Sequence, residues 1–370
     1  MSIRRIGCVT AGGDAPGLNP AIRAIVKTAI LQYGWQVIGF EDGYEGLLTG
    51  RWRTLTLDDV RGQLVRGGTL LGTSNRANPF AFAFPTDEQP RDYSDRLVSL
   101  VEALSLDALI VVGGDGSLSI AYRLWQKGLP ILGVPKTIDN DVQGTILSIG
   151  YATAVAVATD AIDRLHTTAE SHHRVMIVEL MGRTAGWIAL AAGVAGGADV
   201  ILIPEIPFSL DAIVTAIEQR RAAGRHFTII AVAEGAQPVG GSAVAEITGP
   251  LPYQRRYGGI GLLLQAQLAQ RLPLEVRSLA LGHLQRGGPP VALDRLIATA
   301  MGSEAVHMLA RGQLGQVVTV HGNGDDPAAI RVGTVTLADV ARGPRLVPLD
   351  HPLLTSARSI GISLGEEVPA

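Results

Sequence analysis

An apolar stretch that runs directly into a glycine turn constrains this sequence more than any other feature. Residues 109–112 are four consecutive branched apolar residues, and residues 113–117 read Gly-Gly-Asp-Gly-Ser. Such a run is typical of a parallel-sheet strand that helices cover on both faces. Apolar residues then recur at helical spacing until Gly128, with Ser117 as the expected N-cap. With a second apolar run at 131–134, the sequence predicts a strand–helix–strand unit.

The glycine turn of this unit has the composition of a phosphate-binding loop. Glycines such as Gly114 and Gly116 let backbone N–H groups approach an anion, and the start of the helix at Ser117 adds partial positive charge. Asp115 would repel a phosphate unless a cation bridged the two groups. Magnesium is the usual bridge, so Asp115 is the expected metal ligand.

The second strand leads into a loop that carries two carboxylates, Asp139 and Asp141. If the backbone is extended there, both side chains point the same way. A phosphate turn followed by a carboxylate pair is the pattern expected for phosphoryl transfer, in which one Asp accepts the proton of an attacking hydroxyl. Each motif alone is also a common turn or loop, and only their pairing in one unit favours the functional interpretation.

Composition restricts the class of protein. With 370 residues the chain suits two domains, and 47% hydrophobic with 18% charged residues fits a compact α/β protein. The net charge is −3 and basic residues cluster only in pairs such as Arg220-Arg221, which argues against nucleic-acid binding. No apolar run is long enough for a membrane span, and the first strand leaves no room for a signal peptide. The single Cys8 is expected in the core, and the expected location is cytoplasmic.

The rest of the chain repeats the alternation of strands and helices. Strands are expected at 3–10, 37–40, 175–178, 200–203, 228–233 and 277–281, and helices at 18–33, 155–165, 210–224, 258–270 and 293–312. We therefore predict an α/β fold with two doubly wound, mainly parallel sheets. The first domain would take 1–150 with about 285–335, and the second 151–284 with about 336–370. A last strand, a helix and a tail are expected after residue 312.

Five segments resemble the characteristic motifs of the 6-phosphofructokinase family. They are residues 12–19, 113–117, 135–141, Met181-Gly182-Arg183 and residues 281–288. The resemblance implies a nucleotide-binding first domain and a sugar-phosphate-binding second domain, with the active site in the cleft between them. It implies transfer of the γ-phosphoryl group of MgATP to the 1-hydroxyl of fructose 6-phosphate, with ATP as co-substrate and Mg²⁺ as cofactor.

The resemblance also assigns roles to residues near the nucleotide. Asp139 is the base, Thr137 contacts the transferring group, and Arg76 and Arg183 neutralise charge that develops on the phosphoryl oxygens. Asp115, with Asp141 as a second candidate, holds magnesium directly or through water. Gly12 and Tyr44 line the nucleotide site together with Gly114, Gly116 and Ser117; for Tyr44, a solvent-facing loop tyrosine is nearly as good an interpretation.

A second group of residues matches the family's sugar-phosphate site. It consists of Glu234, His283 and Arg286, the backbone near Met181 and Gly182, and Arg174 and Arg277, which the family contributes from a neighbouring subunit. Arginine forks match phosphate oxygens, and a carboxylate accepts hydrogen bonds from sugar hydroxyls. The expected working unit is a homotetramer with active sites shared between subunits.

Three alternatives remain at this point. The chain combines Gly116, which is typical of ATP users, with Lys136, which is typical of pyrophosphate users, and Lys136 can lie near the transferring phosphate with either donor. Because an Asp at position 116 would exclude the nucleotide, Gly116 favours ATP over a pyrophosphate-dependent enzyme. A catalytically silent sugar-phosphate sensor would not need Asp139, and a dinucleotide-binding oxidoreductase would need a Gly-x-Gly-x-x-Gly turn that the first loop lacks.

Overall fold

The computed structural model describes residues 3–247, 255–323 and 326–367, and these fold into two compact units. The first unit comprises the chain up to Thr137 together with Val142–Ala152 and Arg286–Pro344. The second comprises Ile138–Asp141, Thr153–Gln285 and the chain from Arg345 onward. The chain therefore enters the second unit briefly at residue 138 before its main crossing at residue 153.

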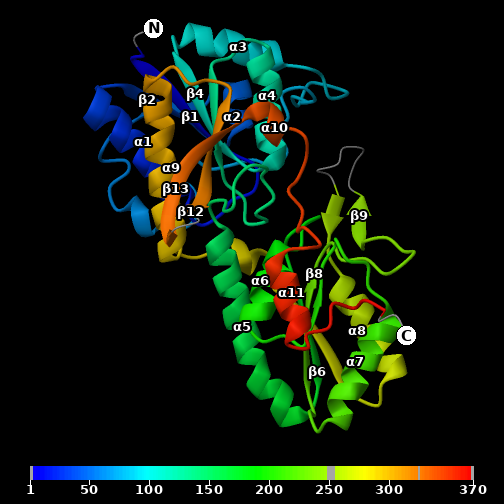
Figure 1. The fold of residues 1–370 in the computed structure, drawn as a ribbon. Helices are drawn as coiled ribbons and strands as arrows, with labels where there is room; N and C mark the ends of the chain where they lie inside the picture. The colour runs from blue at the N-terminus through cyan, green and yellow to red at the C-terminus, as the bar shows by residue number, and fades with distance from the viewer. Residues whose placement is uncertain (1–2, 248–254, 324–325, 368–370) are drawn as a thin grey trace. The chain divides into compact units, whose positions relative to one another are not determined.

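The first unit is built on a seven-stranded sheet within the described part of the chain, in the order β13-β12-β5-β4-β1-β2-β3 (Figure 1). Its inner strands are parallel, and only β3 and β13 run antiparallel to their neighbours. The strands are β1 (Arg5–Ala11), β2 (Gln36–Phe40), β3 (Trp52–Leu55), β4 (Ala108–Gly113), β5 (Ile131–Pro135), β12 (Gln316–Asn323) and β13 (Asp326–Thr336). All six residues of β4 are buried, which confirms the predicted covered strand.

Helices pack on both faces of this sheet. They are α1 (Leu18–Tyr33), α2 (Tyr44–Thr49), α3 (Ser94–Ala103), α4 (Asp115–Gln126), α9 (Ala292–Ala310), α10 (Leu337–Val340) and the 3-10 turn η1 (Gln63–Val65). The apolar faces of α1 and α9 belong to one core cluster, and those of α2, α3, α4 and α10 belong to another. Cys8 is fully buried in the first cluster, as predicted, and burial raises the pKa of its thiol to about 12.

Two sequence-based expectations in this unit are wrong. Helix α4 begins at Asp115 with Gly114 as its N-cap, so Ser117 lies inside the first turn and does not cap it. The reason is that the Leu118 N–H already donates to the Gly114 carbonyl, so the helix begins three residues earlier than expected. The segment after residue 312 was expected to supply one strand and one helix, and it supplies β12, β13, α10 and a further helix in the second unit.

The second unit has a four-stranded parallel sheet in the order β11-β6-β8-β7 within the described residues, as predicted for a doubly wound fold. Its strands are β6 (Val175–Leu180), β7 (Val200–Leu202), β8 (Thr228–Ala233) and β11 (Val276–Ala280), with a separate hairpin of β9 (Ala245–Ile247) and β10 (Arg255–Tyr257). Its helices are α5 (Tyr151–His172), α6 (Trp187–Ala195), α7 (Leu210–Ala222), α8 (Ile260–Arg271), α11 (Pro352–Ser359) and the 3-10 turn η3 (Gly282–Arg286). Residues of α7 and α8 share one core cluster with the sheet.

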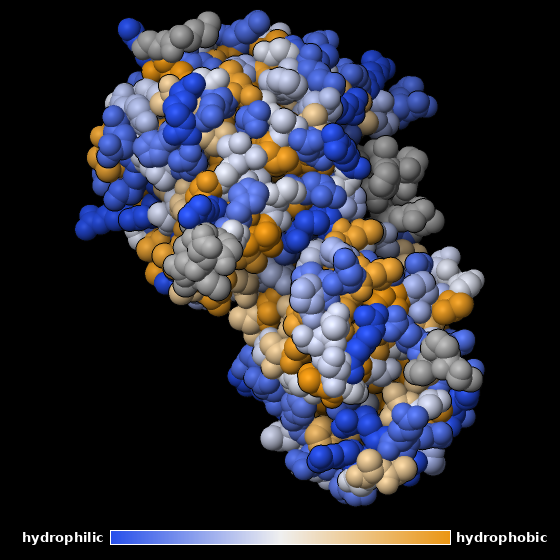
Figure 2. Space-filling view, viewed as in Figure 1, coloured by the Kyte–Doolittle hydropathy of each residue, from blue (hydrophilic) through white to orange (hydrophobic). Residues whose placement is uncertain are grey.

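The surface of each unit is mainly polar. On the face shown in Figure 2, hydrophobic residues form small patches between polar ones. Among the residues that the structure describes, no helix combines the length and apolar character needed to cross a membrane.

Candidate active site

The loop after β1 and the start of α4 pack against each other at the carboxyl edge of the first sheet. Ala11 pairs with Gly113, and Gly113 pairs with Pro135, so β1, β4 and β5 end at the same level. Gly12 has a positive φ of 84°, and a Cβ on it would lie 2.8 Å from Ser117 Oγ. Both conformation and space therefore require glycine at this position.

Lys136 supports this loop from inside the protein. It is 2% exposed, and its Nζ donates to the Ala11 carbonyl at 3.0 Å and to the Gly13 carbonyl. The ammonium group is therefore bound to the loop backbone and stabilises the turn around Gly12. A buried charge needs such partners, because desolvation without them is costly.

The first turn of α4 places the predicted metal ligand and two glycine-loop residues at the helix N-terminus. Asp115 is the first helical residue and is half-buried, and Gly116 follows it at an exposed position. A Cβ on Gly116 would meet no atom within 4 Å. Tyr44 is 1% exposed and its hydroxyl donates to the Ser117 carbonyl at 2.7 Å, while burial raises the pKa of its phenol. The solvent-facing alternative for Tyr44 is therefore wrong. The Tyr44 hydroxyl supports the turn through its hydrogen bond to the Ser117 carbonyl.

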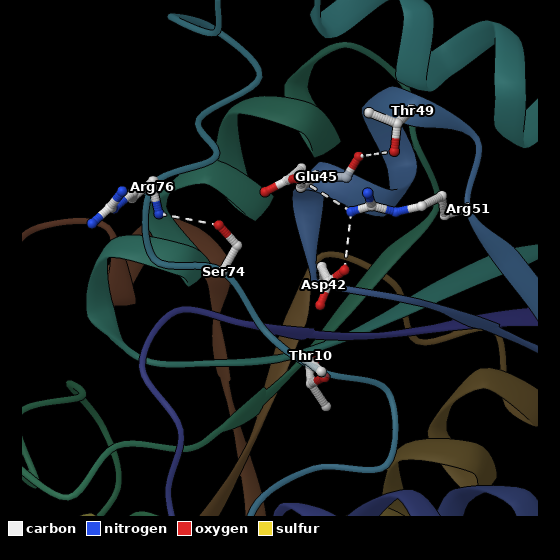
Figure 3. A network of polar contacts seen from close by, with 8 residues as sticks. Thr10, Asp42, Glu45, Thr49, Arg51, Ser74 and Arg76 are labelled. Atoms are coloured by element: carbon white, nitrogen blue, oxygen red, sulfur yellow. Dashed lines mark hydrogen bonds and ion pairs between the residues drawn. The ribbon is translucent and has the colours of Figure 1, made fainter. Parts of the chain in front are cut away.

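The loop that carries Arg76 lies against the same glycine turn. Thr73 Oγ1 donates to the Gly12 carbonyl at 2.6 Å, and the Gly12 N–H donates to the Ser74 carbonyl at 3.1 Å. Arg76 itself is exposed, and Figure 3 shows its side chain extending away from the ion-paired group around Arg51. The structure thus anchors the backbone two residues before Arg76 and leaves the guanidinium accessible.

An ion-paired group around Arg51 lies near the loop that carries Arg76. Arg51 Nη2 lies 3.0 Å from Asp42 Oδ2 and 3.1 Å from Glu45 Oε1, at the start of α2 (Figure 3). These three side chains are all substantially exposed, so the pairs contribute little to stability. One cation faces two carboxylates in this group, and Arg76 takes no part in its ion pairs.

Arg286 belongs to the first unit, although the sequence assigns it to the sugar phosphate. Its Nη1 donates to the Asp14 carbonyl at 2.8 Å, so the guanidinium lies against the same loop that contains Gly12. One face of this arginine is bound to backbone, and its remaining donors stay available to an anion.

The turn 138–141 differs from the extended segment that the sequence suggested. Asn140 has a positive φ of 55°, so the backbone between Asp139 and Asp141 reverses direction. The extended backbone expected between Asp139 and Asp141 is therefore wrong, and the alternation argument does not apply to this turn, because alternation holds only for extended backbone. Asp139 and Asp141 are 4% and 6% exposed, and the Thr137 carbonyl accepts a hydrogen bond from Ser148 Oγ at 2.7 Å.

In the second unit, the ends of β6, β8 and β11 bring together the other predicted residues. The Arg183 N–H donates to Glu234 Oε1 at 3.0 Å, and the Met181 N–H donates to Gln285 Oε1 at 2.9 Å. Arg183 itself has a positive φ of 52°. Such a conformation is unfavourable for a residue with a Cβ, and the hydrogen bond that the Arg183 N–H donates to Glu234 helps to hold it.

Met181, Gly182, Arg183 and Glu234 are thus adjacent. His283 is exposed in η3, two residues before the buried Gln285. The group presents a guanidinium, an imidazole and a carboxylate from three neighbouring strand ends, which is where ligands bind in open α/β sheets.

Arg174 and Arg277 lie at the opposite edge of the same sheet. Arg174 immediately precedes β6, and Arg277 lies at the beginning of β11. Arg183 and His283, in contrast, follow the ends of these strands. Glu275 pairs with both arginines, and its hydrogen bond with Arg174 lowers the pKa of the Glu275 carboxyl. A strand as long as β6, with 6 residues, separates the two groups by roughly 20 Å. One chain therefore cannot use both groups on one sugar phosphate.

Sequence reasoning missed two buried residues that support the group formed by Arg183, Glu234 and His283. Gln285 is fully buried and orients Met181, as described above. Glu179 is 7% exposed and accepts hydrogen bonds from the Gly259 and Gly261 N–H groups at the start of α8. A carboxylate inside an otherwise apolar strand was the signal for Glu179, since such a charge is buried only when it is paired.

The residues fit a magnesium ion that is shared with a phosphate ligand. The described residues contain no group of three His, Cys, Asp or Glu side chains that could hold a metal by themselves. Magnesium commonly takes one or two carboxylates and completes its shell with waters and phosphate oxygens. Asp115, at the start of a helix next to an open glycine turn, supplies that kind of ligand.

Comparison with known proteins places this geometry among related chains. A family model described as Phosphofructokinase matches residues 5–309. The ATP-dependent 6-phosphofructokinase of Chloroflexus aurantiacus is 49% identical over 366 residues, covering 99% of each chain. ATP-dependent 6-phosphofructokinase 1 of Synechocystis sp. is 44% identical over 368 residues, again covering 99% of each chain.

Solved structures show the same fold. Phosphofructokinase from Pichia pastoris matches with a TM-score of 0.77 and 33% identity, covering 97% of this chain and 39% of that one. A pyrophosphate-dependent phosphofructokinase from Marinobacter aquaeolei matches with a TM-score of 0.79 over 100% of this chain and 93% of that one. Its identity is 24%, so this second likeness concerns the fold alone.

Proposed function

The chain belongs to the phosphofructokinase family, and from this premise we propose that it is an ATP-dependent 6-phosphofructokinase that acts in glycolysis. It transfers the γ-phosphoryl group of ATP to the 1-hydroxyl of fructose 6-phosphate. The observation that carries this proposal is the glycine turn at Gly114–Ser117, with free space at Gly116, followed by the buried Asp139, in a chain 49% identical over its length to an ATP-dependent relative.

The reaction needs a base for the attacking hydroxyl, and Asp139 takes this role. The bond from the sugar O1 to the γ-phosphorus forms while the bond from that phosphorus to the ADP oxygen breaks, and the hydroxyl proton passes to the Asp139 carboxylate. Thr137 lies two residues earlier and contacts the transferring group. A positioned base contributes about 100- to 10,000-fold to such a rate.

Charge neutralisation accounts for most of the remaining rate enhancement in phosphoryl transfer. Arg76 and Arg183 bind the equatorial oxygens of the transferring group, and Gly12, Gly114, Gly116 and Ser117 offer backbone donors to the nucleotide phosphates. Asp115 would hold magnesium, with Asp141 as a second candidate ligand, and the ion when bound would neutralise charge on the phosphates. Tyr44 keeps the turn at Ser117 in place.

The sugar phosphate binds to the residues that match the family's sugar-phosphate site. Glu234 accepts hydrogen bonds from the sugar hydroxyls, and the backbone of Met181 and Gly182 also forms hydrogen bonds with the sugar. His283 and Arg286 add cationic or polar contacts. Arg174 and Arg277 reach the 6-phosphate of a site in a neighbouring subunit, because their position excludes them from the site of their own chain. We propose a homotetramer with shared sites as the working assembly, located in the cytoplasm.

ATP is the favoured phosphoryl donor over pyrophosphate. A side chain at position 116 would project from an exposed position of the first helical turn, and glycine leaves that space free. Lys136, the residue that pointed to pyrophosphate, donates to two loop carbonyls in this chain. Its role in holding the loop is compatible with either donor, so Gly116 decides between them.

A coupled assay for fructose 1,6-bisphosphate tests the proposal directly. We expect a magnesium-dependent rate with ATP and fructose 6-phosphate, and a much lower kcat/KM with pyrophosphate. A higher kcat/KM with pyrophosphate would reverse the choice of donor. Binding of fructose 6-phosphate without turnover with either donor would instead support the silent sensor.

A further inference from the structure

The segment that begins at Arg345 returns to the turn that contains Asp139. The Arg345 N–H donates to the Asp141 carbonyl at 2.7 Å, and Arg345 Nη2 donates to the Asn140 carbonyl at 2.8 Å. These partners are 205 positions apart in the sequence, and all of them belong to the second unit. One arginine thus binds two consecutive carbonyls immediately after Asp139.

The guanidinium of Arg345 is itself fixed by Trp187, the first residue of α6. Its Cζ lies 4.1 Å from the centre of the Trp187 ring, and Trp187 Nε1 donates to the Arg345 carbonyl at 2.9 Å. The imidazole ring of His351 packs edge-on against the Trp187 ring, with ring centres 5.3 Å apart. A planar guanidinium stacked on an aromatic ring has little rotational freedom, so its hydrogen bonds are directed.

Glu205 attaches the same segment to the start of α6 from a second direction. Its carboxylate accepts the Gly186 N–H at 3.0 Å and the Val347 N–H at 2.9 Å. Burial raises the pKa of this carboxyl, and the two N–H donors act in the opposite direction. Helix α11, which follows and is red in Figure 1, packs beside α6. The backbone on both sides of Leu346 is therefore held to α6.

The turn needs such support because Asn140 has a positive φ of 55°. A residue with a Cβ adopts this conformation at a cost, and it persists only where the surroundings hold it. The Arg345 guanidinium, a strong donor, binds the Asn140 carbonyl, while the Arg345 backbone N–H binds the Asp141 carbonyl, so the side chain fixes the Asn140–Asp141 peptide group and the backbone fixes the next one. Without these hydrogen bonds, the turn can relax and the Asp139 carboxylate can move with it.

We propose that Arg345 is a positioning residue for phosphoryl transfer, which holds Asp139 in its working orientation without touching either substrate. The proposal rests on the proposed function, in which Asp139 is the base. Misplacement of a reacting group by about 1 Å costs on the order of 100-fold in rate. A positioning residue of this kind affects the chemical step and leaves ground-state binding of the substrates unchanged.

The test compares Arg345→Ala and Arg345→Lys with the unchanged protein. For Arg345→Ala we expect kcat to fall on the order of 100-fold with little change in KM for either substrate. Arg345→Lys keeps a cationic donor without the planar guanidinium, so its kcat should lie between those of Arg345→Ala and the unchanged protein. Added guanidinium at non-denaturing concentration should restore part of the turnover of Arg345→Ala and none of that of Arg345→Lys.

Arg358→Ala serves as the matched control. Arg358 lies in the same segment, on α11, and pairs with Glu366 at 2.9 Å without contact to the turn. Its removal should leave kcat unchanged. Circular dichroism melts of all variants show whether they are folded.

The outcomes separate this proposal from the proposed function. If the unchanged protein has no kinase activity, the proposed function fails irrespective of Arg345. If Asp139→Ser keeps full turnover, Asp139 is not the base and the positioning role of Arg345 is overturned with it. If Asp139→Ser is inactive and folded Arg345→Ala turns over at the normal rate, the positioning role is overturned. If Arg345→Ala does not fold, Arg345→Lys and Trp187→Phe decide, since Trp187→Phe removes the Nε1–H donor to Arg345 and keeps a smaller aromatic ring at that position. Normal kcat in both of these variants overturns the proposal.

Discussion

Lys136 lies against the loop around Gly12, where its Nζ donates hydrogen bonds to the carbonyls of Ala11 and Gly13. The residue type alone suggested a cation near the transferring phosphate, and the structure gives it a backbone role. Arg286 changes in the same way, since its Nη1 donates to the Asp14 carbonyl. At the scale of single residues, cations that the sequence assigns to ligands also hold the loops that form the ligand site.

Asp139→Ser is expected to lower turnover by about 100- to 10,000-fold, because the hydroxyl proton then has no positioned acceptor. The KM for fructose 6-phosphate should change little, since the carboxylate acts in the transition state. Steady-state kinetics of the purified variant measure both quantities. Asp160→Ser, which removes an exposed carboxylate paired with Arg164 on α5, is the control. Near-normal turnover in Asp139→Ser would exclude Asp139 as the base.

Gly116→Asp is expected to lower kcat/KM for ATP by at least about tenfold, through like-charge repulsion of the nucleotide phosphates. The variant should fold normally because a Cβ at this position meets no atom within 4 Å. Gly116→Ala separates size from charge and should keep most of the activity. An Asp variant that uses ATP as well as the unchanged protein would remove position 116 as the determinant of donor choice.

At the scale of elements, local patterns predicted what local forces determine. The helical spacing from Leu18 to the stop at Gly34 gave α1 with its bounds, and the buried run at 109–112 gave β4. The N-cap of α4 was wrong because residue type favoured Ser117 while the backbone hydrogen bond of Leu118 selected Gly114. The site residues in these loops were named from motifs, and their catalytic roles stay predictions.

The elements that the sequence did not reveal depend on distant partners. Strand β13 is paired with β12 over most of its length, and the segment at Arg345 binds a turn 205 positions earlier. The positive φ of Asn140 was not anticipated, because asparagine tolerates both positive and negative φ and the residue type alone does not choose between them. Periodicity carries no information about such long-range contacts.

The start of α11 makes stability depend on pH. His351 is the N-cap of this helix, and its Nδ1 accepts the Leu353 N–H at 3.2 Å. Desolvation, and next the positive charge of Arg345, lower the pKa of His351 below its ordinary value of 6.5. The folded state therefore binds this proton less readily than the unfolded state, so the His351 contribution is present above pH 6.5 and is lost as the pH falls through the folded pKa.

Denaturant titrations over this pH range should show the effect as a difference between variants. Glu205 and Asp199 have raised pKa values from burial, and they contribute with the opposite sign, since their stability is lost as the pH rises. The comparison with His351→Ser cancels these groups, because serine also caps a helix and does not titrate. We expect the stability of the unchanged protein relative to His351→Ser to decline from pH 7 toward pH 5. A constant difference would contradict the assignment.

At the scale of the whole molecule, the second unit carries its cationic groups at two opposite edges of one sheet. Arg183 and His283 follow the ends of β6 and β11, while Arg174 and Arg277 lie at their beginnings around Glu275. The family resemblance assigns both groups to the same sugar phosphate. Both statements hold together only if a second copy of the chain supplies Arg174 and Arg277.

Mixing two inactive variants tests this sharing. In tetramers that combine Asp139→Ser and Arg174→Ala chains, a site can draw Asp139 from one chain and Arg174 from the other. With equal mixing, about one site in four should regain both groups and with them activity, since each symmetric interface joins two chains at random. The control mixes Asp139→Ser with Arg183→Gln. Asp139 and Arg183 are assigned to the same chain, so no mixed site contains both and activity should stay absent. Native mass spectrometry must show that mixed tetramers have formed in both cases. If they have formed and the first mixture stays as inactive as the second, Arg174 does not act across subunits.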